Sequence, residues 1–247
     1  NYCQNKIYAS TYGRGSYSVP LPPIPDYHIT SALTLPAYYN QTFSNRIFAD
    51  ANVLVNIKGT INFGPNGDYV VNPQSHTILT GTLSTECPQL WNGVQVGGDI
   101  TNNQSYSGGF GVYQGILEVL NGGTIQRAWN AVTTGTTDAI GNFDFSSTGG
   151  VVSCSKANFI DNARDIQYMS YPFNNNKGVF SQCKFETNNP LLGAVIPQAH
   201  ITMWNVNGVK VIGSDFNYNA GGAYPLGSRG TGIGTADAKF SVRPFCL

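Results

Sequence analysis

The chain has 247 residues and a formal net charge of zero, and only 11% of its residues are charged. Ordinary soluble domains carry about 25% charged residues, so this chain lacks the basic surplus that nucleic-acid binding requires. Its apolar runs also stay well short of the roughly 18 residues of a membrane-spanning helix. The composition therefore argues against nucleic-acid partners and a membrane span, and it favours a Gly-rich extracellular β protein.

Residues 1–45 form a Pro- and Tyr-rich N-terminal segment. Four of its prolines lie close together in SVPLPPIPDYHIT and predict an extended, partly polyproline backbone. We expect this segment to be a linker, or a strap that caps the open end of the domain that follows. The chain begins at Asn1 without Met and without a signal-peptide hydrophobic region, which indicates a processed start.

From residue 46 onward, short strands are expected between turn residues. The segments RIFADANVLVNI, GTINFG, GDYVVN and HTILTGTL cluster or alternate β-formers. Residues 100–114 then form a polar, Gly-rich loop, and a further coil follows from Gly115, with Ile125 in the position that later coils give to Phe. No segment keeps a 3.6-residue period long enough to predict a helix.

Four later segments repeat one small pattern, beginning at Gly150, Gly178, Gly208 and Gly232. Each places a small residue two positions before a Phe, and the spacings between these aromatic residues are 26, 31 and 24: Phe159, Phe185, Phe216 and Phe240. An Asn follows each of the first three by three positions: Asn162, Asn188 and Asn219. A drifting period in this range, without intervening helices, predicts a β-solenoid.

The expected fold is a right-handed parallel β-helix of about seven or eight coils over residues 46–247, with three short strands per coil. Like residues stack above like residues, so the four Phe side chains should form one buried column. The three Asn side chains should form a hydrogen-bonded ladder at an inward turn, or else act only as turn-formers. Few residues follow the last repeat, so we expect a domain truncated at its C-terminal end, with open strand edges.

The five cysteines form an odd set: Cys3, Cys87, Cys154, Cys183 and Cys246. None belongs to a CxxC pair or lies near a His at metal-ligand spacing, so neither a metal nor a cofactor is predicted. Cys154 and Cys183 occupy apolar positions of the repeat in different columns and need not form a disulfide. One pair among the other three could be oxidised.

Three stretches from about Phe43 onward carry a family resemblance. They are ANVLVNIKGTINFGPNGDYVVNP, then ECPQLWNGVQVGG, and then the run from FIDNARDIQYMSY through KFETN and HITMWNVNGVKVIGSDFNYN to RGTGIGTADAKFSV. In order and wording they resemble secreted β-helix proteins of the pectate-lyase-like fold that Bacteroidota export through the type IX secretion route. The resemblance implies a secreted or surface-attached parent protein with a sorting domain outside this chain. It implies no particular catalytic activity.

The β-helix fold hosts polysaccharide lyases and hydrolases, so paired acids were the first catalytic candidates. Hydrolysis needs two carboxylates about 5–9.5 Å apart, and a lyase needs calcium-binding acids beside a basic residue. The acids of the repeats fall in different columns, and one short stretch, DNARD, offers a weak candidate site: Asp161, Arg164 and Asp165. The alternative is a solvated coil edge with an internal ion pair. His200 is expected at an outward or turn position.

Aromatic side chains near polar loops offer a second kind of site. Sugars stack on exposed aromatic faces while amides and carboxylates bond to their hydroxyls. The weak candidates for such glycan binding are Tyr106, Tyr113, Tyr168, Tyr171 and Tyr218. The alternative is that these tyrosines pack loops onto the rod.

Three functional hypotheses follow. The first is a non-enzymatic domain in the extracellular space or on the cell surface, a rigid stalk or adhesin with weak glycan affinity. Its partners would be a polysaccharide, other surface proteins, or further coils of the parent chain. The second is a polysaccharide lyase or glycoside hydrolase whose acids come partly from coils outside this chain. The third is a subunit of a surface filament or larger assembly, because open strand edges can pair with a neighbour.

Overall fold

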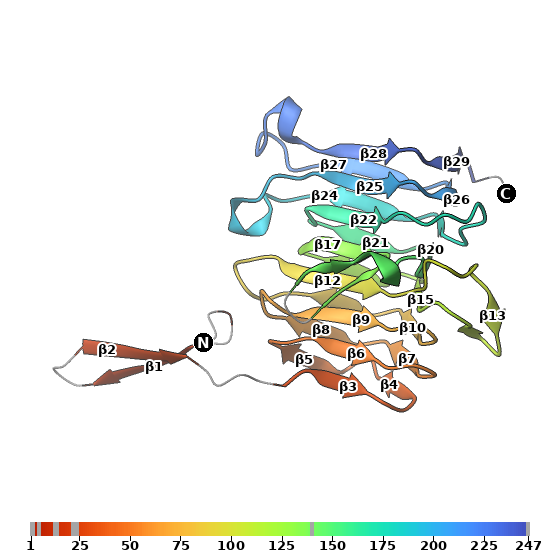
Figure 1. Ribbon diagram of the computed structural model, residues 1–247. Helices are drawn as coiled ribbons and strands as arrows, with labels where there is room; N and C mark the ends of the chain where they lie inside the picture. Colours follow the sequence, from red (N-terminus) through yellow and green to blue (C-terminus); the bar gives the residue numbers. More distant parts are fainter. Residues whose placement is uncertain (1–2, 4–5, 12–14, 21–24, 139–140, 246–247) are drawn as a thin grey trace.

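The computed structural model describes residues 3, 6–11, 15–20, 25–138 and 141–245, and most of them build one rod of stacked coils (Figure 1). Each coil gives one short strand to each of three parallel sheets that run along the rod. Within the described residues two sheets have eight strands and one has seven, which makes seven complete coils and two strands of an eighth. The fold is the predicted right-handed parallel β-helix.

In each coil the chain passes through a first, a second and a third sheet in that order. The first sheet consists of β3 (Tyr27–Ile29), β6 (Ile47–Ala49), β9 (Asp68–Val71), β12 (Trp91–Val96), β17 (Ala128–Thr133), β22 (Arg164–Tyr168), β25 (Ala199–Trp204) and β28 (Thr231–Ala236). The second consists of β4 (Leu33–Leu35), β7 (Leu54–Ile57), β10 (His76–Leu79), β15 (Ile116–Leu120), β20 (Val151–Ser155), β23 (Val179–Ser181), β26 (Asn207–Ile212) and β29 (Lys239–Arg243). The third consists of β5 (Asn40–Phe43), β8 (Thr60–Phe63), β11 (Thr82–Ser84), β16 (Thr124–Gln126), β21 (Asn158–Ile160), β24 (Lys184–Thr187) and β27 (Asp215–Tyr218).

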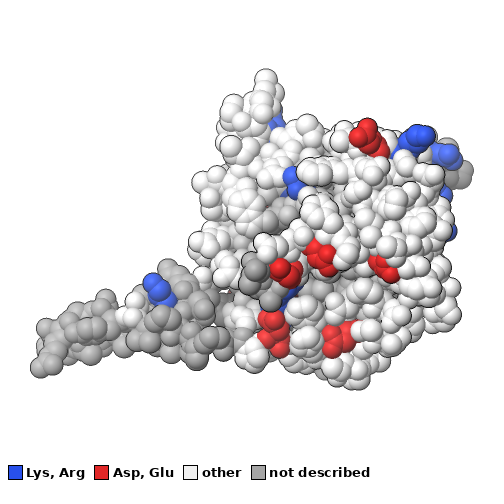
Figure 2. Space-filling model, in the orientation of Figure 1, with Lys and Arg blue, Asp and Glu red and all other residues white. Residues whose placement is uncertain are grey.

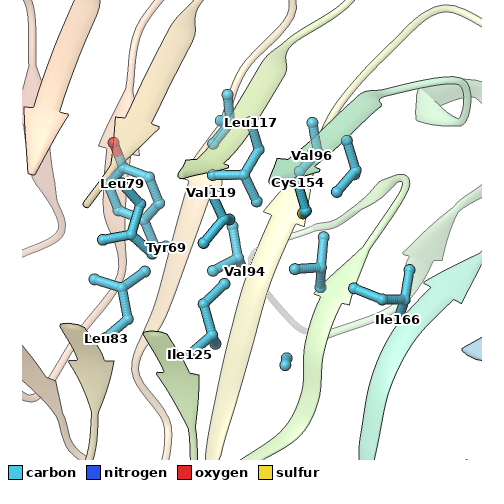
Figure 3. Close-up of a cluster of buried hydrophobic side chains, with 14 of the residues drawn as sticks. Tyr69, Leu79, Leu83, Val94, Val96, Leu117, Val119, Ile125, Cys154 and Ile166 are labelled. Carbon is cyan, nitrogen blue, oxygen red and sulfur yellow. The ribbon is translucent and has the colours of Figure 1, made fainter. Parts of the chain in front are cut away.

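The core fills the inside of the rod, where apolar side chains from all three sheets meet. Figure 3 shows Val94 from the first sheet, Val119 from the second and Ile125 from the third pointing toward one another. Three corners between the second and third sheets turn on a single residue in the left-handed conformation, namely Lys156, Gln182 and Gly213, with φ of 53°, 55° and 54°. Such a one-residue corner keeps the strands short and stacks each coil directly on the last.

An aromatic column runs through the third sheet. Ile125, Phe159, Phe185 and Phe216 occupy successive positions of one register. The Phe185 ring stacks 5.0 Å from Phe159 and 4.8 Å from Phe216, within 8° of parallel. The expectation that Phe240 extends this column is wrong. Phe240 lies on β29 of the second sheet, opposite Val209, and is 37% exposed.

The misplacement of Phe240 has a simple cause. The repeated sequence marks a strand, a corner with one residue in the left-handed conformation and a second strand, and such a unit also occurs between the first and second sheets, where Asp237 has φ of 51°. In the first three repeats the corner joins the second and third sheets, whereas Gly232 lies on β28 and Phe240 on β29, so that the fourth repeat spans the first and second sheets.

The expected asparagine ladder has only two members. Asn219 Nδ2 donates to Asn188 Oδ1 over 2.8 Å. Asn162 instead closes the corner between β16 and β17: its Oδ1 accepts from Ala128 N over 2.8 Å, and its Nδ2 donates to Ile125 O over 3.0 Å. Burial explains the difference, because Asn162 is enclosed by the coil and its amide must bond to the buried groups around it, whereas Asn219 is exposed.

The first coil begins at Tyr27, ahead of the boundary at residue 46 expected from the sequence. Before it, β1 (Lys6–Thr11) and β2 (Gly15–Pro20) form an antiparallel hairpin that lies beside the first coils in Figure 1 and does not cover β28 or β29. A disulfide joins Cys3 to Cys87, after β11.

Two further cysteines lie at the buried, apolar positions that the sequence predicted for them. Cys154 and Cys183 are buried free thiols, and Cys154 shares a register position with Phe180. Cys246 lies outside the described residues. In the part of the chain that the structure describes, no helix is long and apolar enough to cross a membrane.

Candidate functional site

Two consecutive coils carry long excursions at the corner between the first and second sheets. Residues 97–115 leave β12 and contain the short pair β13 (Tyr106–Ser107) and β14 (Phe110–Gly111). Residues 134–150 leave β17 and contain the hairpin β18 (Thr136–Thr137) and β19 (Phe143–Asp144), followed by the 3-10 turn η2 (Phe145–Ser147). Since β12 and β17 are adjacent strands, the two excursions are neighbours. Hollows lie on both sides of the β18–β19 hairpin.

The hollow over the first sheet is a cleft of about 310 Å³, called here the Trp129 cleft. The β18–β19 hairpin lies over the first sheet in Figure 1 and forms one wall of the cleft. The side chains that line it include two aromatic and several polar ones, among them Trp129, Phe143, Asn92, Asn130, Thr133 and Gln167. They come from β12, β17, β19 and β22, so three successive coils and one hairpin build the site.

A polar network beneath the hairpin fastens it to the first sheet. Arg46 Nε donates to Asp68 Oδ1 over 2.9 Å, and Gln95 Nε2 donates to Asp68 Oδ2 over 2.8 Å. Thr137 N, on the hairpin, donates to Gln95 Oε1 over 2.6 Å, and the Arg46 guanidinium donates to Thr137 O over 3.2 Å. Desolvation raises the pKa of Asp68, and the charge of Arg46 opposes that rise. The paired network holds the hairpin as a fixed wall.

Two aromatic side chains line this cleft. Trp129 is 42% exposed even though it lies within a strand of the rod. Phe143 comes from the hairpin and packs edge-on against Phe145, with the ring centroids 5.0 Å apart. Gly135 makes room for it: the residue has φ of +154°, and a Cβ there would lie 2.5 Å from Phe143 Cζ. A larger residue at position 135 would therefore displace this aromatic wall.

The amides of the cleft have unused hydrogen-bonding groups. Arg164 Nη1 donates to Asn130 Oδ1 over 3.0 Å, and because a guanidinium only donates, Asn130 Nδ2 is left as a donor without a partner among the described residues. Asn92 Nδ2 donates to Asn66 O over 3.2 Å, which leaves Asn92 Oδ1 as a free acceptor. The Gln167 side chain bonds to no residue that the structure describes. The cleft thus presents both donors and acceptors beside an exposed indole.

The second hollow, of about 850 Å³, lies on the other side of the hairpin and has a different character. It contains Tyr113 and three carboxylates: Asp50, Asp99 and Asp144. Hydrogen bonds from the Thr101 hydroxyl and backbone lower the pKa of Asp99, so this carboxylate stays ionised. Asp99 and Asp144 accept bonds from residues of their own loops, and Asp50 accepts from Asn72 Nδ2 of the next coil over 3.2 Å. This hollow is therefore acidic, whereas the Trp129 cleft is uncharged.

The structure uses the DNARD residues inside the coil rather than at a surface site. Asp161 Oδ1 accepts the backbone N–H groups of Asn188 and Asn189 over 2.7 and 2.9 Å, and so holds the next coil's turn. Arg164 does not form the expected ion pair with either acid, since its guanidinium donates to Asn130 and to Gln198. Both carboxylates are buried. The alternative of a solvated coil edge with an internal ion pair is therefore wrong for this stretch.

Asp165 pairs with a histidine that the sequence analysis expected at an outward or turn position. His200 Nδ1 lies 2.6 Å from Asp165 Oδ2, and Asn162 Nδ2 donates to Asp165 Oδ1 over 2.8 Å. The imidazole packs against the rings of Phe185 and Phe216. Desolvation raises the pKa of Asp165, and the bond from His200 opposes the rise. The signal for this pair was weak, because the residues lie 35 positions apart and meet only through coil stacking.

The five candidate tyrosines divide into three groups. Tyr168 and Tyr171 are buried and do not offer a face to a ligand. Tyr218 lies under Arg229, whose guanidinium carbon is 4.8 Å from the ring centroid, and its hydroxyl accepts from Tyr224 N. Tyr106 and Tyr113 are exposed. The aromatic with the best surroundings for a ligand, Trp129, was missed because the sequence WNAV is indistinguishable from an ordinary strand.

Comparisons with protein-family models, curated proteins and solved structures found no match for this chain. Among the described residues, no three or more His, Cys, Asp or Glu side chains converge on a point where they could hold a metal ion.

Proposed function

We propose that this chain is a non-enzymatic, extracellular β-helix domain of a secreted or cell-surface bacterial protein, which acts as a rigid adhesin and binds a glycan in the Trp129 cleft. The proposal rests on one observation: an exposed indole lines a cleft whose polar lining consists of amides and hydroxyls. A pyranose ring carries apolar C–H groups on its faces and hydroxyls on its rim. Aromatic surface beside convergent polar groups suits both kinds of surface.

Two features support an extracellular location. The disulfide between Cys3 and Cys87 closes a separation of 84 residues, and such bonds form and persist mainly in oxidising compartments. The low content of charged residues is typical of the secreted β-helix proteins that the sequence resembles. The proposal also includes a secreted parent protein of the type IX kind, because the sequence resembles proteins of that kind.

The rod supports a display role rather than a catalytic one. One continuous apolar core runs along the coils and includes the stacked Phe column. The acids weighed for catalysis, Asp161 and Asp165, are buried and hydrogen-bonded within that rod. A stiff scaffold that carries an aromatic cleft on its side suits attachment to a surface polysaccharide.

The test is a glycan array probed with the purified chain and two tryptophan variants. We expect the wild type to bind at least one class of polysaccharide and Trp129→Ala to lose that binding. Trp204→Ala is the matched control, because Trp204 is also an exposed tryptophan of the first sheet, at 50%, but does not line the cleft. Absence of binding by the wild type to every glycan on the array would refute the proposal, and so would equal losses in the two variants.

A further inference from the structure

We infer that the Trp129 cleft selects an uncharged pyranose, reads it through Asn130, Asn92 and Gln167, and rejects uronic, sialylated and sulfated sugars without using a metal ion. This inference rests on the proposed glycan-binding function and names the class of sugar that the site would take. It is carried by three observations on the cleft: the charge of its lining, the charges around it, and the hydrogen-bonding groups left free in it.

The lining of the cleft is uncharged. Its side chains are amides, hydroxyls and aromatics, and no Lys, Arg, Asp or Glu is among them. Of the two nearby arginines, Arg46 pairs with the Asp68 carboxylate, and Arg164 does not line the cleft but directs Nη1 and Nη2 at the Asn130 and Gln198 amides. A sugar carboxylate or sulfate entering the cleft would lose hydration and find no cationic partner, and burying an unpaired charge is costly.

The surroundings add repulsion against anions. The neighbouring hollow shares the hairpin with the cleft and carries Asp50, Asp99 and Asp144. Figure 2 shows the hairpin's face of the molecule as largely uncharged, with most of its acidic side chains over the lower and middle coils. An anionic polysaccharide lying across this face would meet like charges. At low ionic strength that repulsion is screened least.

The free hydrogen-bonding groups suit hydroxyls. Asn130 Nδ2 is a donor whose orientation Arg164 sets, Asn92 Oδ1 is an acceptor, and Gln167 offers both. A sugar hydroxyl donates and accepts at once, so it can satisfy such a mixed set, whereas a carboxylate can only accept. The lining lacks the carboxylate oxygens that a calcium-bridged sugar would need. Binding should therefore be independent of Ca²⁺.

The experiment is isothermal titration of the wild-type chain with hexasaccharides of β-1,4-glucose, β-1,4-mannose and α-1,4-galacturonic acid, each with CaCl₂ and with EDTA. We expect binding to at least one neutral hexasaccharide and none to the galacturonate, with the same affinity in both buffers. Trp129→Ala and Asn130→Asp should each weaken neutral binding by at least about tenfold, which is the size expected for loss of one anchoring contact. Trp204→Ala should change it less than about twofold.

Asn130→Asp is the sharper variant, because it keeps the side-chain shape and the bond to Arg164 while it replaces the free donor with a carboxylate. Its melting curve should match the wild type, which separates lost recognition from lost folding. Galacturonate binding that disappears in Trp129→Ala would overturn the inferred sugar class and leave the proposed glycan function standing. A strict requirement for Ca²⁺ would also overturn the inference. Failure of the wild type to bind any saccharide would overturn the proposed function itself.

Discussion

The stacked Phe column predicts a graded loss of stability when its members are truncated. Phe185 is fully buried between two parallel rings, Phe216 is partly exposed at the end of the column, and Phe240 lies outside it. We expect Phe185→Ala to cost the most, Phe216→Ala less and Phe240→Ala least. The order follows from how much contact each ring loses when its side chain is removed.

The magnitudes follow from burial. Truncating a fully buried Phe to Ala costs about 3–5 kcal/mol, and each stacked ring pair adds about 0.5–1.5 kcal/mol beyond the buried area. Phe185 takes part in two such pairs, so Phe185→Ala should lie near the top of the range, at about 5 kcal/mol. With one ring pair and partial exposure, Phe216→Ala should cost about half of that. Phe240→Ala, an exposed position, should cost less than about 1 kcal/mol.

The measurement is urea-induced unfolding followed by circular dichroism, with the change in free energy taken from the shift of the midpoint at a shared slope. Phe185→Leu is the control, because it keeps most of the apolar volume and should cost under about 1.5 kcal/mol plus the lost stacking. A Phe240→Ala variant as destabilised as Phe185→Ala would refute the assignment of β29 to the second sheet. Equal costs for Phe185 and Phe216 would refute the order along the column.

Three further outcomes are expected. Tyr168→Phe should raise the free energy of unfolding by about 1 kcal/mol, because the buried Tyr168 hydroxyl has no partner among the described residues. Tyr171→Phe should lower the free energy of unfolding by about 1 kcal/mol, because it removes the 2.6 Å bond to Asn102 O. Calorimetry of the two variants should show shifts of opposite sign. Arg46→Met should cost about 3–5 kcal/mol by leaving a buried carboxylate unpaired, and limited proteolysis should then cut first within the β18–β19 hairpin. Burial raises the pKa of Asp165 above its ordinary value of 3.8, so the folded state binds the proton of this carboxyl more tightly than the unfolded chain does. The free energy of unfolding should therefore fall as the pH rises from 3.8 through the raised pKa. Asp165→Asn should flatten this fall in urea titrations between acidic and neutral pH, and an unchanged slope would contradict the buried carboxylate.

Absence of catalysis is a separate expectation. The purified chain should release neither reducing ends nor unsaturated products from pectic polysaccharides, because Asp161 and Asp165 are buried within hydrogen-bonded turns. Product release that disappears in Asp161→Asn or Asp165→Asn would show that these acids reach a substrate.

The architecture of this protein could be predicted from its sequence alone. Short runs of β-formers separated by turn residues were sufficient to predict a solenoid and its approximate number of coils. One internal column could be predicted from the recurrence of Phe159, Phe185 and Phe216. A solenoid allows this because each coil contacts only its neighbours, so the requirements of stacking reappear in the sequence at every turn. The same local signal could not say which corner a repeat occupies, and Phe240 was misplaced for that reason.

The proposed ligand cleft could be located only in the folded structure. The residues that line the cleft belong to different coils or to an excursion between them, and each looks ordinary within its own strand or loop. They include Asn92, Trp129, Phe143 and Gln167. They meet because parallel strands place residues of successive coils side by side, and because the Arg46 network folds one excursion back onto the first sheet. Stacking repeats along the sequence and can be predicted from it, whereas the way a loop folds back depends on contacts that occur only once.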